Sequence, residues 1–334
     1  MKICIVKLSA MGDIIHAMVA LQFIKRELPN IQIDWIVEAG FKDILQNNPH
    51  IDNILPINLK SIKKKKSAIF KQYKILKEYS KNNYDLVIDA QGLLKSAIVS
   101  KIVANKSIAG FDKNSIRESI ASLFYDNKIN IPYEANAINR NMAVICKALY
   151  IEYTKEDILN KEPFLYSSLH VEQQMEYIVF VAGASRENKI YPKEKFVELA
   201  NKLQKHILIV WGNEDEKETA EFIAQSSKFA YVAPKGDLDK LKHTIQNSKF
   251  VIGGDTGPTH MAWALNIPSI TIFGNTPEYR NTYITPINQV VKSDSIVNPL
   301  KLDHSDFSIQ NIKVDEIVNL YYDILSYKPK QLES

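Results

Sequence analysis

The sequence predicts an α/β protein of two Rossmann-like, doubly wound halves that face a central cleft. Three observations predict it. Short β-branched runs alternate with helical patterns from the first residue, and the alternation restarts near residue 177. The length of 334 residues also suits two domains of roughly 150 residues each. Strands separated by helices of this length form βαβ units and parallel sheets, which bind ligands beyond the carboxyl ends of their strands.

In the first half, the apolar runs predict strands and the helical spacing of apolar residues predicts helices. The expected strands are 3–7, 31–37, 54–57, 86–88 and 107–111, and the expected helices are 14–26, 41–46, 92–103, 115–125 and 137–150. Segment 61–67 holds four consecutive lysines, Lys63 to Lys66. It is interpreted either as an exposed loop or as a contact for anionic lipid headgroups.

The second half repeats this order. The expected strands are 177–182, 207–211, 231–232, 250–252 and 269–273, and the expected helices are 193–203, 215–225, 238–247, 258–264 and 314–327. Segment 151–174, rich in Glu, Lys and Ser, is the expected linker. We therefore expect an amino-terminal domain at 1–160, a second domain at 175–315, and a final helix and tail at 316–334.

Composition narrows the class of protein. With 46% hydrophobic and 24% charged residues the chain is typical of a soluble globular protein. Cys4 and Cys146 lie in apolar runs without metal-ligand spacing, which favours a reducing compartment. No apolar run reaches the roughly 18 residues of a membrane span, and the charged start predicts a strand rather than a signal peptide. A cytoplasmic protein with a possible peripheral membrane contact is expected.

The net charge of +4 is unevenly spread, since residues 1–170 carry a basic excess and the remainder an acidic one. This pattern indicates either that the first half meets an anionic partner or that lysines cover solvated helices. No nucleic-acid partner is expected.

Several cofactor motifs are absent from the sequence. There is no Gly-x-Gly-x-x-Gly after a strand and no Gly-x-x-x-x-Gly-Lys-Ser/Thr, so a dinucleotide or P-loop site is not expected. Asp237-Leu238-Asp239 could hold a metal, but its place after Gly236 at the start of a helical pattern favours helix capping. No His, Cys or carboxylate cluster has zinc spacing, and neither a metal nor a cofactor is expected.

Three loops carry candidate site residues. After the first strand, Ser9, Gly12 and Asp13 lead into a helix, so the Asp13 carboxylate is either a catalytic group at the strand end or a helix cap. Gly253-Gly254-Asp255-Thr256-Gly257-Pro258-Thr259-His260 follows a buried strand and opens a helix, which is a favourable site for an anion such as pyrophosphate. Ser185 and Lys189 follow the first strand of the second half and offer a hydroxyl and a cation.

Together these segments resemble glycosyltransferase family 9, the bacterial lipopolysaccharide heptosyltransferases. The resemblance rests on Gly12-Asp13, Lys189-x-Tyr191-Pro192 and Asp255 to His260, with Gln91-Gly92-Leu93-Leu94-Lys95-Ser96 and Arg117 to Tyr125 in support, and it covers about residues 1–325. It implies a GT-B fold, an inverting mechanism without metal, and ADP-L-glycero-β-D-manno-heptose as donor. It also implies Kdo on lipid A as acceptor, and an enzyme at the inner face of the bacterial inner membrane.

The resemblance also implies roles for single residues. Asp13 matches the general base that deprotonates the acceptor, and Glu216 matches the acid that binds the ribose. Ser185 and Lys189 match diphosphate contacts, and Lys189 is also expected to be catalytic, because its ammonium would stabilise the leaving group in place of a metal. Asp255, Thr256, Gly257 and His260 match contacts to the donor phosphates and heptose. Lys235 stands where a Met beside the adenine is expected, and Ala184 where a hydroxyl is expected.

The acceptor is expected to contact Ser9, Gly12, Lys95 and Arg117 on the first half. Of these, Arg117 is the best candidate for a carboxylate of the acceptor, because its guanidinium can hold a carboxylate through two parallel hydrogen bonds. Three alternatives stay open at this point. They are a family member that uses a heptosylated acceptor, a nucleotide-sugar 2-epimerase of the same fold, and a nucleotide-sugar-binding module without catalysis.

Overall fold

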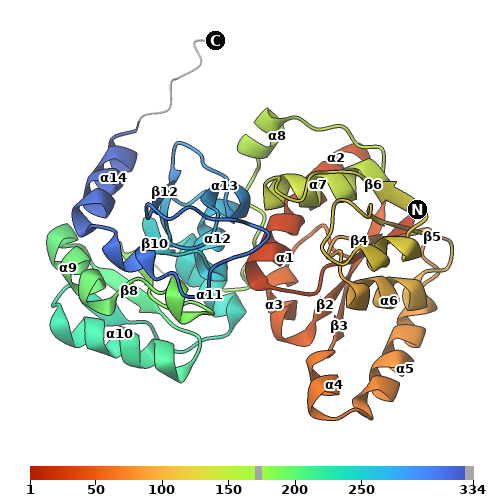
Figure 1. Ribbon diagram of the computed structural model, residues 1–334, viewed down its shortest axis with the longest axis horizontal. Helices are drawn as coiled ribbons and strands as arrows, with labels where there is room; N and C mark the ends of the chain where they lie inside the picture. Colours follow the sequence, from red (N-terminus) through yellow and green to blue (C-terminus); the bar gives the residue numbers. More distant parts are fainter. Residues whose placement is uncertain (170–174, 328–334) are drawn as a thin grey trace. The chain divides into compact units, whose positions relative to one another are not determined.

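The computed structural model describes residues 1–169 and 175–327 of the chain. It divides into two compact units, Met1–Ser168 (unit 1) and Leu169–Ser334 (unit 2). Each unit contains a six-stranded sheet in which all strand pairs are parallel. The predicted α/β class with two doubly wound halves is confirmed (Figure 1).

The sheet of unit 1 has the strand order β3-β2-β1-β4-β5-β6. Its strands are β1 (Lys2–Val6), β2 (Gln32–Glu38), β3 (Asn53–Ile57), β4 (Leu86–Asp89), β5 (Ser107–Phe111) and β6 (Asn127–Ile129). One face is covered by α1 (Met11–Met18), α2 (Ala20–Glu27) and α7 (Ala137–Ala148), which contact one another through α7. The other face carries α5 (Ala68–Ser80), α6 (Leu94–Val103) and the 3₁₀ turn η2 (Ser119–Phe124), with α6 in contact with both neighbours.

The sheet of unit 2 has the equivalent order β12-β11-β10-β7-β8-β9. Its strands are β7 (Ile178–Val181), β8 (Ile207–Val210), β9 (Ala230–Val232), β10 (Phe250–Gly254), β11 (Ser269–Phe273) and β12 (Asn288–Lys292). Helices α9 (Lys193–Leu203), α10 (Glu214–Ser226) and α14 (Val314–Ser326) pack together on one face, whereas α11 (Leu238–Gln246) and α12 (Gly257–Ala264) pack together on the other. The described secondary structure also includes several short elements. They are η1 (Ala39–Phe41), α3 (Lys42–Leu45), α4 (Lys60–Lys64), α8 (Lys155–Leu159), η3 (Glu187–Lys189), α13 (Glu278–Asn281) and η4 (Ser308–Asn311).

Buried aliphatic strands account for this architecture. Strand β7 reads Ile-Val-Phe-Val with every residue buried, as expected for a strand covered on both faces. The core of unit 2 joins these strands to α9, α10 and α14 through Phe180, Phe196 and Phe250, which are fully buried. Each such side chain stabilises the fold by about 1.5–3 kcal/mol relative to exposure.

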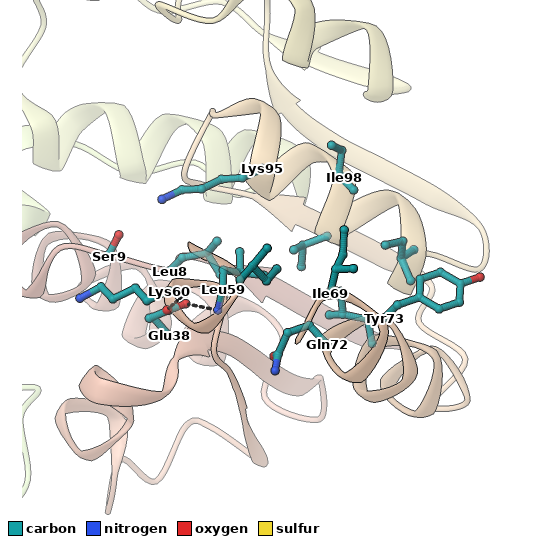
Figure 2. Close-up of a pocket in the computed structure, with 14 residues that line it drawn as sticks. Leu8, Ser9, Glu38, Leu59, Lys60, Ile69, Gln72, Tyr73, Lys95 and Ile98 are labelled. Atoms are coloured by element: carbon teal, nitrogen blue, oxygen red, sulfur yellow. Dashed lines mark hydrogen bonds between the residues drawn. The ribbon is translucent and has the colours of Figure 1, made fainter. Parts of the chain in front are cut away.

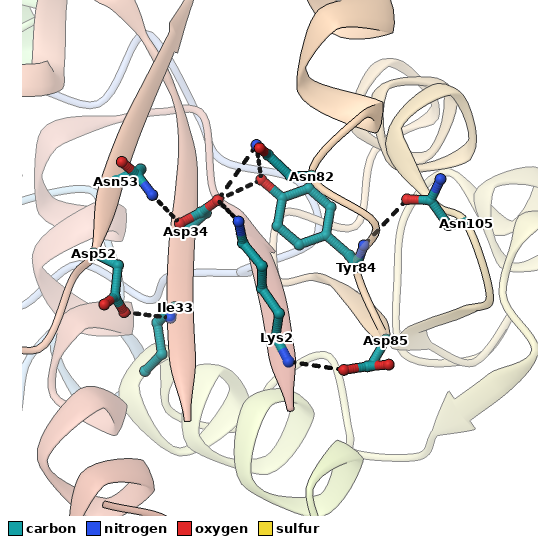
Figure 3. A network of polar contacts seen from close by, with 9 residues as sticks. All are labelled: Lys2, Ile33, Asp34, Asp52, Asn53, Asn82, Tyr84, Asp85 and Asn105. Carbon is teal, nitrogen blue, oxygen red and sulfur yellow. Dashed lines mark hydrogen bonds and ion pairs between the residues drawn. The ribbon is translucent and has the colours of Figure 1, made fainter. Parts of the chain in front are cut away.

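Polar groups at the amino ends of the unit 1 strands pair among themselves (Figure 3). The buried Asp34 carboxylate accepts hydrogen bonds from Tyr84 Oη at 2.6 Å and Asn53 Nδ2 at 2.8 Å, and it lies 3.5 Å from Lys2 Nζ. Burial raises the pKa of the Tyr84 hydroxyl, and the Cys4 thiol and the Asp34 hydrogen bond add to the effect. These groups stabilise the sheet at the amino ends of its strands. The candidate site residues lie at the other side, at the carboxyl ends.

The structure corrects several local predictions. The helix predicted at 14–26 is two consecutive helices, α1 and α2, that meet at Val19. The helix predicted at 115–125 is wrong, because only the turn η2 forms there. The Asp112 carboxylate accepts hydrogen bonds from the backbone N–H of Asn114 and of Ser115 and from the Ser115 hydroxyl, which holds the segment in a turn.

Other elements were not predicted at all. Part of segment 61–67 is helical, because α4 (Lys60–Lys64) begins where the Glu38 carboxylate accepts the backbone N–H groups of Leu59 and Lys60. Helix α5, with strands β6 and β12, was also missed. The predicted linker contains α8 (Lys155–Leu159), capped by Thr154 and Asp157, while residues 170–174 of it lie outside the described residues.

No helix within residues 1–169 and 175–327 is long and apolar enough to cross a membrane.

Candidate functional site

The centre of the site in unit 2 is the Asp255 carboxylate, which directly follows β10. Lys189 Nζ donates to Oδ2 at 2.8 Å and also to the Asp255 backbone carbonyl at 2.8 Å. Nε2 of His260 lies 3.1 Å from Oδ1, and because a carboxylate only accepts, this nitrogen carries the proton. Sequence reasoning found these three residues in two separate loops, and the fold brings them together.

Two further donors complete the contacts of this carboxylate. Thr276 Oγ1 donates to Oδ2 at 2.9 Å and Asn281 Nδ2 donates to it at 3.1 Å. Neither residue was predicted. Thr276 follows β11, the strand next to β10, so the rule that ligands gather at the carboxyl ends of neighbouring strands could have found it. Asn281 comes from α13 and had no comparable signal.

These donors determine the charge of Asp255. Burial alone would raise its pKa, but the Lys189 ammonium and the His260 hydrogen bond outweigh burial and hold the pKa of the Asp255 carboxyl far below its ordinary value. Asp255 is therefore ionised at neutral pH. Its oxygens accept four side-chain hydrogen bonds, so the carboxylate fixes the position of Lys189 and His260.

The start of α12 adjoins this carboxylate. Thr256 is the N-cap residue, Gly257 begins the helix, and Pro258 occupies the first turn, where it removes one N–H that would lack a helical partner. The buried hydroxyls of Thr256 and Thr259 have no hydrogen-bond partner within the described part of the chain. Backbone N–H groups and two hydroxyls at a positive helix end form a site suited to an anion.

Glycines keep this region open. A Cβ at Gly253 would lie 2.5 Å from the Val181 side chain and 2.8 Å from Thr259 Oγ1, so the end of β10 has no room for a side chain at this position. A Cβ at Gly183 would lie 2.4 Å from the Glu216 carboxyl carbon. The Glu216 side chain thus rests on the turn after β7.

Glu216 lies in the first turn of α10. Its Oε2 accepts the Gly212 backbone N–H at 2.7 Å, and its own N–H donates to the N-cap residue Asn213 at 3.0 Å. Glu216 therefore sits at the carboxyl ends of β7 and β8 with one oxygen engaged by the backbone.

The other predicted donor contacts are exposed. Ser185 is exposed and forms no hydrogen bond with a described residue, so the structure does not join it to the Asp255 cluster. The Lys235 ammonium is also exposed and lies 5.4 Å from the centroid of the Trp211 ring. Nε1 of Trp211 donates to the Ala233 carbonyl at 2.8 Å, which fixes the ring beside Lys235.

In unit 1, Asp13 lies in the first turn of α1 and is exposed. Its Oδ2 accepts the Ala10 backbone N–H at 3.1 Å, which is a helix-capping contact. The other oxygen, Oδ1, accepts no hydrogen bond from a described residue. The capping interpretation of this residue is confirmed, since one oxygen stabilises the helix start. Because the residue is exposed and its other oxygen is not engaged by a described residue, the catalytic interpretation stays a prediction.

The loop that carries Asp13 is held by Gln91. Oε1 of Gln91 accepts the backbone N–H groups of Leu8 at 3.0 Å and of Ser9 at 3.1 Å. Gly12 lies within the first turn of α1. The side chain after β4 therefore fixes the backbone after β1, and Gln91 acts on the loop of Asp13 through the main chain.

Lys7 and Asp89 stabilise the same edge of the sheet. Lys7 is buried and donates to the Ala90 carbonyl at 2.8 Å and to Asn141 Oδ1 at 3.1 Å, so it is not available to a ligand. The buried Asp89 carboxylate accepts the N–H groups of Gln91 and Gly92 and the Tyr125 hydroxyl.

Burial raises the pKa of the Asp89 carboxyl, and these neutral donors lower it less than burial raises it. Gly92 has φ +69°, a conformation that glycine adopts readily, and it allows the turn that Asp89 closes.

Lys95 and Arg117 are exposed on unit 1. The Arg117 guanidinium lies 5.3 Å from the centroid of the Tyr133 ring. Lys95 and Ser9 both line a pocket beside α6 (Figure 2). Arg117 does not line that pocket, so the predicted acceptor contacts do not all lie on one cavity.

The predicted capping role of Asp237 is confirmed, since its side chain accepts the Lys240 backbone N–H at 2.9 Å as the N-cap of α11. Within the described ranges no three His, Cys, Asp or Glu side chains are arranged to hold a metal ion.

The similarity of this chain to known proteins extends over both units. A family model described as glycosyltransferase family 9 (heptosyltransferase) matches residues 72–302. Lipopolysaccharide heptosyltransferase 1 of Campylobacter coli is 41% identical over 96% of this chain and 98% of its own length. The enzyme of the same name from Escherichia coli K12 is 34% identical over 83% of this chain and 88% of its own. The structure of E. coli heptosyltransferase WaaC with ADP has a TM-score of 0.82 and 27% identity, and the match covers 97% of this chain and 100% of that one.

Two parallel six-stranded α/β sheets that match this structure define a GT-B type glycosyltransferase fold. The chain belongs to glycosyltransferase family 9, the heptosyltransferases. It is thus an enzyme of the glycosyltransferase class, which excludes the epimerase and binding-module alternatives.

Proposed function

We propose that this enzyme transfers L-glycero-D-manno-heptose from ADP-heptose to Kdo of Kdo-lipid A in the synthesis of the lipopolysaccharide inner core. The relatives named lipopolysaccharide heptosyltransferase 1 and the ADP in the solved E. coli structure support the donor and the pathway. The observation that carries the proposal is the fixing of Lys189 and His260 on one buried carboxylate at the start of α12. A cation beside a helix start is suited to a leaving diphosphate.

The proposed chemistry is a single displacement with inversion. The acceptor hydroxyl oxygen forms a bond to the anomeric carbon of the heptose while the bond from that carbon to the diphosphate oxygen breaks. ADP leaves with the bonding electrons, and the hydroxyl proton passes to Asp13. The exposure of Asp13 supports its role as general base, which typically contributes about 10²- to 10⁴-fold.

In this proposal unit 2 binds the donor. The Lys189 ammonium and the N–H groups at Gly257 and Thr259 stabilise the negative charge that develops on the diphosphate. Thr256 and Ser185 offer hydroxyls to the phosphates, and His260 contacts the donor from its place on Asp255. Glu216 accepts from the ribose hydroxyls, and Lys235 lies beside the base.

We further propose that no metal ion takes part in the transfer. The groups named for the diphosphate supply the positive charge that a divalent cation supplies in other transferases. The transfer rate is therefore expected to be unchanged in EDTA, and a strict requirement for added Mg²⁺ would show that these groups are not sufficient.

The acceptor is assigned to unit 1, to Ser9 and Gly12 in the loop of Asp13, to Lys95 in the first turn of α6 and to Arg117 in the segment after β5. Kdo carboxylates and lipid A phosphates are anions, which agrees with the basic excess of residues 1–170. Because this acceptor is a membrane lipid, we propose that the protein works in the cytoplasm as a peripheral protein at the inner face of the inner membrane.

The test is a product assay with the purified protein, ADP-heptose and Kdo-lipid A. We expect a heptosylated product with inverted anomeric configuration, which mass spectrometry and NMR identify. Transfer only to an acceptor that already carries a heptose would assign the protein to a different member of the family.

A further inference from the structure

Unit 1 contains a largely apolar pocket. The proposed function assigns two residues of its lining, Ser9 and Lys95, to the acceptor and leaves its apolar part without a role. The pocket has a volume of about 500 Å³, within the range of roughly 300–1,000 Å³ that is typical of ligand sites. More than half of the residues that line it are aliphatic, and α5 and α6 supply Ile69, Ile98, Val99 and Ile102 among them, together with the Tyr73 ring. We call this cavity the α5–α6 pocket.

The α5–α6 pocket has one polar end (Figure 2). Ser9, Lys60 and Lys95 lie there, whereas Ile69, Tyr73 and Ile98 lie toward the other end. The Glu38 carboxylate at the polar end is engaged by the backbone N–H groups of Leu59 and Lys60 at 3.2 and 2.9 Å. The exposed charges at this end are consequently two ammonium groups, which complement an anion.

Exposed apolar side chains continue the surface outside the pocket. Phe70 on α5 is 71% exposed, and Ile120 and Leu123 on η2 are 61% and 76% exposed. Since α6 contacts both α5 and η2, these side chains extend along one helical layer of unit 1. Large exposed apolar side chains gathered on one layer indicate an interaction surface.

Lysines flank this apolar surface. Lys64, Lys65 and Lys66 at the end of α4, and Lys71 and Lys74 on α5, are exposed. Apolar side chains among exposed lysines are the pattern of a segment that lies on an anionic membrane, where each basic residue contributes about 1 kcal/mol.

We propose that the α4–α5–α6 face docks on an anionic lipid bilayer and that the α5–α6 pocket receives one acyl chain of an anionic lipid of that bilayer. The apolar and basic side chains outside the pocket extend beyond what one bound amphiphile could contact, which favours a bilayer. The polar end places the lipid headgroup beside Lys60 and Lys95 and the chain among the isoleucines. This inference rests on the proposed function for its purpose, which is to bring the enzyme to the membrane that holds its acceptor. Lipid binding itself does not depend on the transfer reaction.

The pocket is tested first with dodecyl phosphate below its micellar concentration, by isothermal titration calorimetry on the full chain. We expect one equivalent to bind, with affinity rising up to about fourfold for each added methylene from octyl to dodecyl phosphate. Inorganic phosphate and dodecyl maltoside should bind at least about tenfold more weakly. Equal binding of all three compounds, or no binding of dodecyl phosphate, would overturn the assignment.

A matched pair of variants separates the pocket from the surface. Ile69→Glu places a carboxylate in the pocket wall, whereas Phe70→Glu makes the same change at the next residue of α5, which does not line the pocket. Both positions are exposed and lie in the first turn, where an acidic residue is favourable to the helix. Ile69→Glu should weaken dodecyl phosphate binding at least about tenfold, and Phe70→Glu should leave it within about threefold. Equal losses in both would contradict a site in the pocket.

Sedimentation with vesicles tests the face as a whole. We expect binding to phosphatidylglycerol vesicles but not to pure phosphatidylcholine vesicles, and weaker binding in both variants. Self-association of the protein that Ile69→Glu abolishes, without vesicle binding, would assign the face to a second copy of the chain and overturn the proposal.

Transfer to a fully deacylated acceptor without vesicles reports on the proposed function separately. Ile69→Glu should retain the wild-type kcat and KM in that assay while it loses lipid binding. A wild-type protein that binds lipid but fails to transfer would contradict the proposed function and leave the lipid site standing.

Discussion

The two units place a buried carboxylate at the same topological position and use it in opposite ways. Asp89 ends β4 and Asp255 follows β10, and each of these strands lies directly beside the first strand of its sheet. Asp89 accepts from two backbone N–H groups and the Tyr125 hydroxyl, and its pKa is raised. Asp255 accepts from Lys189 and His260, and its pKa is lowered.

The difference shows that topology selects the place of a polar group and that its partners decide its role. With neutral donors, the Asp89 carboxylate closes a turn that carries Gln91, which in turn holds the loop of Asp13. With a cationic donor, Asp255 holds an ammonium group at the start of α12. The loops after β1 and β7 also carry opposite charges. The loop after β1 presents the exposed carboxylate of Asp13, and the loop after β7 presents the ammonium of Lys189.

The largest expected effect comes from removing the cation. Lys189→Met leaves a buried, ionised Asp255 without its main counter-charge, which should lower the free energy of unfolding of unit 2 by about 3–5 kcal/mol. Lys7→Met in unit 1 removes a donor from two neutral acceptors and should cost about 1–3 kcal/mol. Urea denaturation with hydrogen exchange read separately for each unit measures both values. Equal costs in the two variants would show that the charge of the partner does not matter.

Removing the exposed carboxylate should affect transfer and not stability. Asp13→Asn retains the shape of the side chain but not the base, so kcat should fall at least about 10²-fold while ADP-heptose binding is unchanged. Asp237→Asn is the control, because it makes the same change at an exposed helix N-cap that has no part in the proposed mechanism. Near-normal turnover in Asp13→Asn would remove this residue from the mechanism.

A buried lysine in unit 1 offers a contrast to Lys189. Burial lowers the pKa of Lys161 to about 7, and the nearby Glu162 opposes this only in part. The folded protein therefore bears a cost for the charged form that is complete below pH 7 and disappears as the pH approaches 10.5. Lys161→Met should raise the free energy of unfolding by up to about 5 kcal/mol at pH 6 and by much less at pH 10. A gain that does not change with pH would point to packing instead of charge.

The two carboxylates should also give opposite pH slopes, each at most about 1.4 kcal/mol per pH unit. An unfolded aspartate titrates near pH 4. Because the pKa of Asp255 is lowered by folding, its carboxylate stabilises the protein fully above about pH 4 and less as the pH falls below it. The pKa of Asp89 is raised, so its contribution falls as the pH rises from about 4 toward the folded-state value.

Unfolding of Asp255→Asn and Asp89→Asn between pH 3 and 8 measures these slopes relative to the wild type. The stability lost in Asp255→Asn should grow with rising pH, whereas the loss in Asp89→Asn should shrink. Slopes of the same sign would mean that the partners do not decide the charge of the two groups.

Much of the fold could be predicted from local pattern. Runs such as Ile178–Val181 are too apolar to lie anywhere but in a buried strand, and their spacing by helices leaves little choice but parallel sheets. The failures occurred where local signals were weak. Strands β6 and β12 are short or half polar, and the apolar residues of α5 are largely exposed, so neither a period of two nor a single buried helical face marks them.

The sequence by itself determined two repeats of an α/β pattern, the strand ends that carry Asp13, Lys189 and Asp255, and the membership of family 9. Only the tertiary structure decided that Lys189, His260, Thr276 and Asn281 meet on the Asp255 carboxylate. Lys189 lies 66 positions before Asp255 and Asn281 lies 26 positions after it, so they become neighbours only when the parallel strands align. The same holds for the α5–α6 pocket, whose walls come from separate helices. Local pattern specifies each strand and helix, whereas the side chains that touch depend on how the sheet orders them.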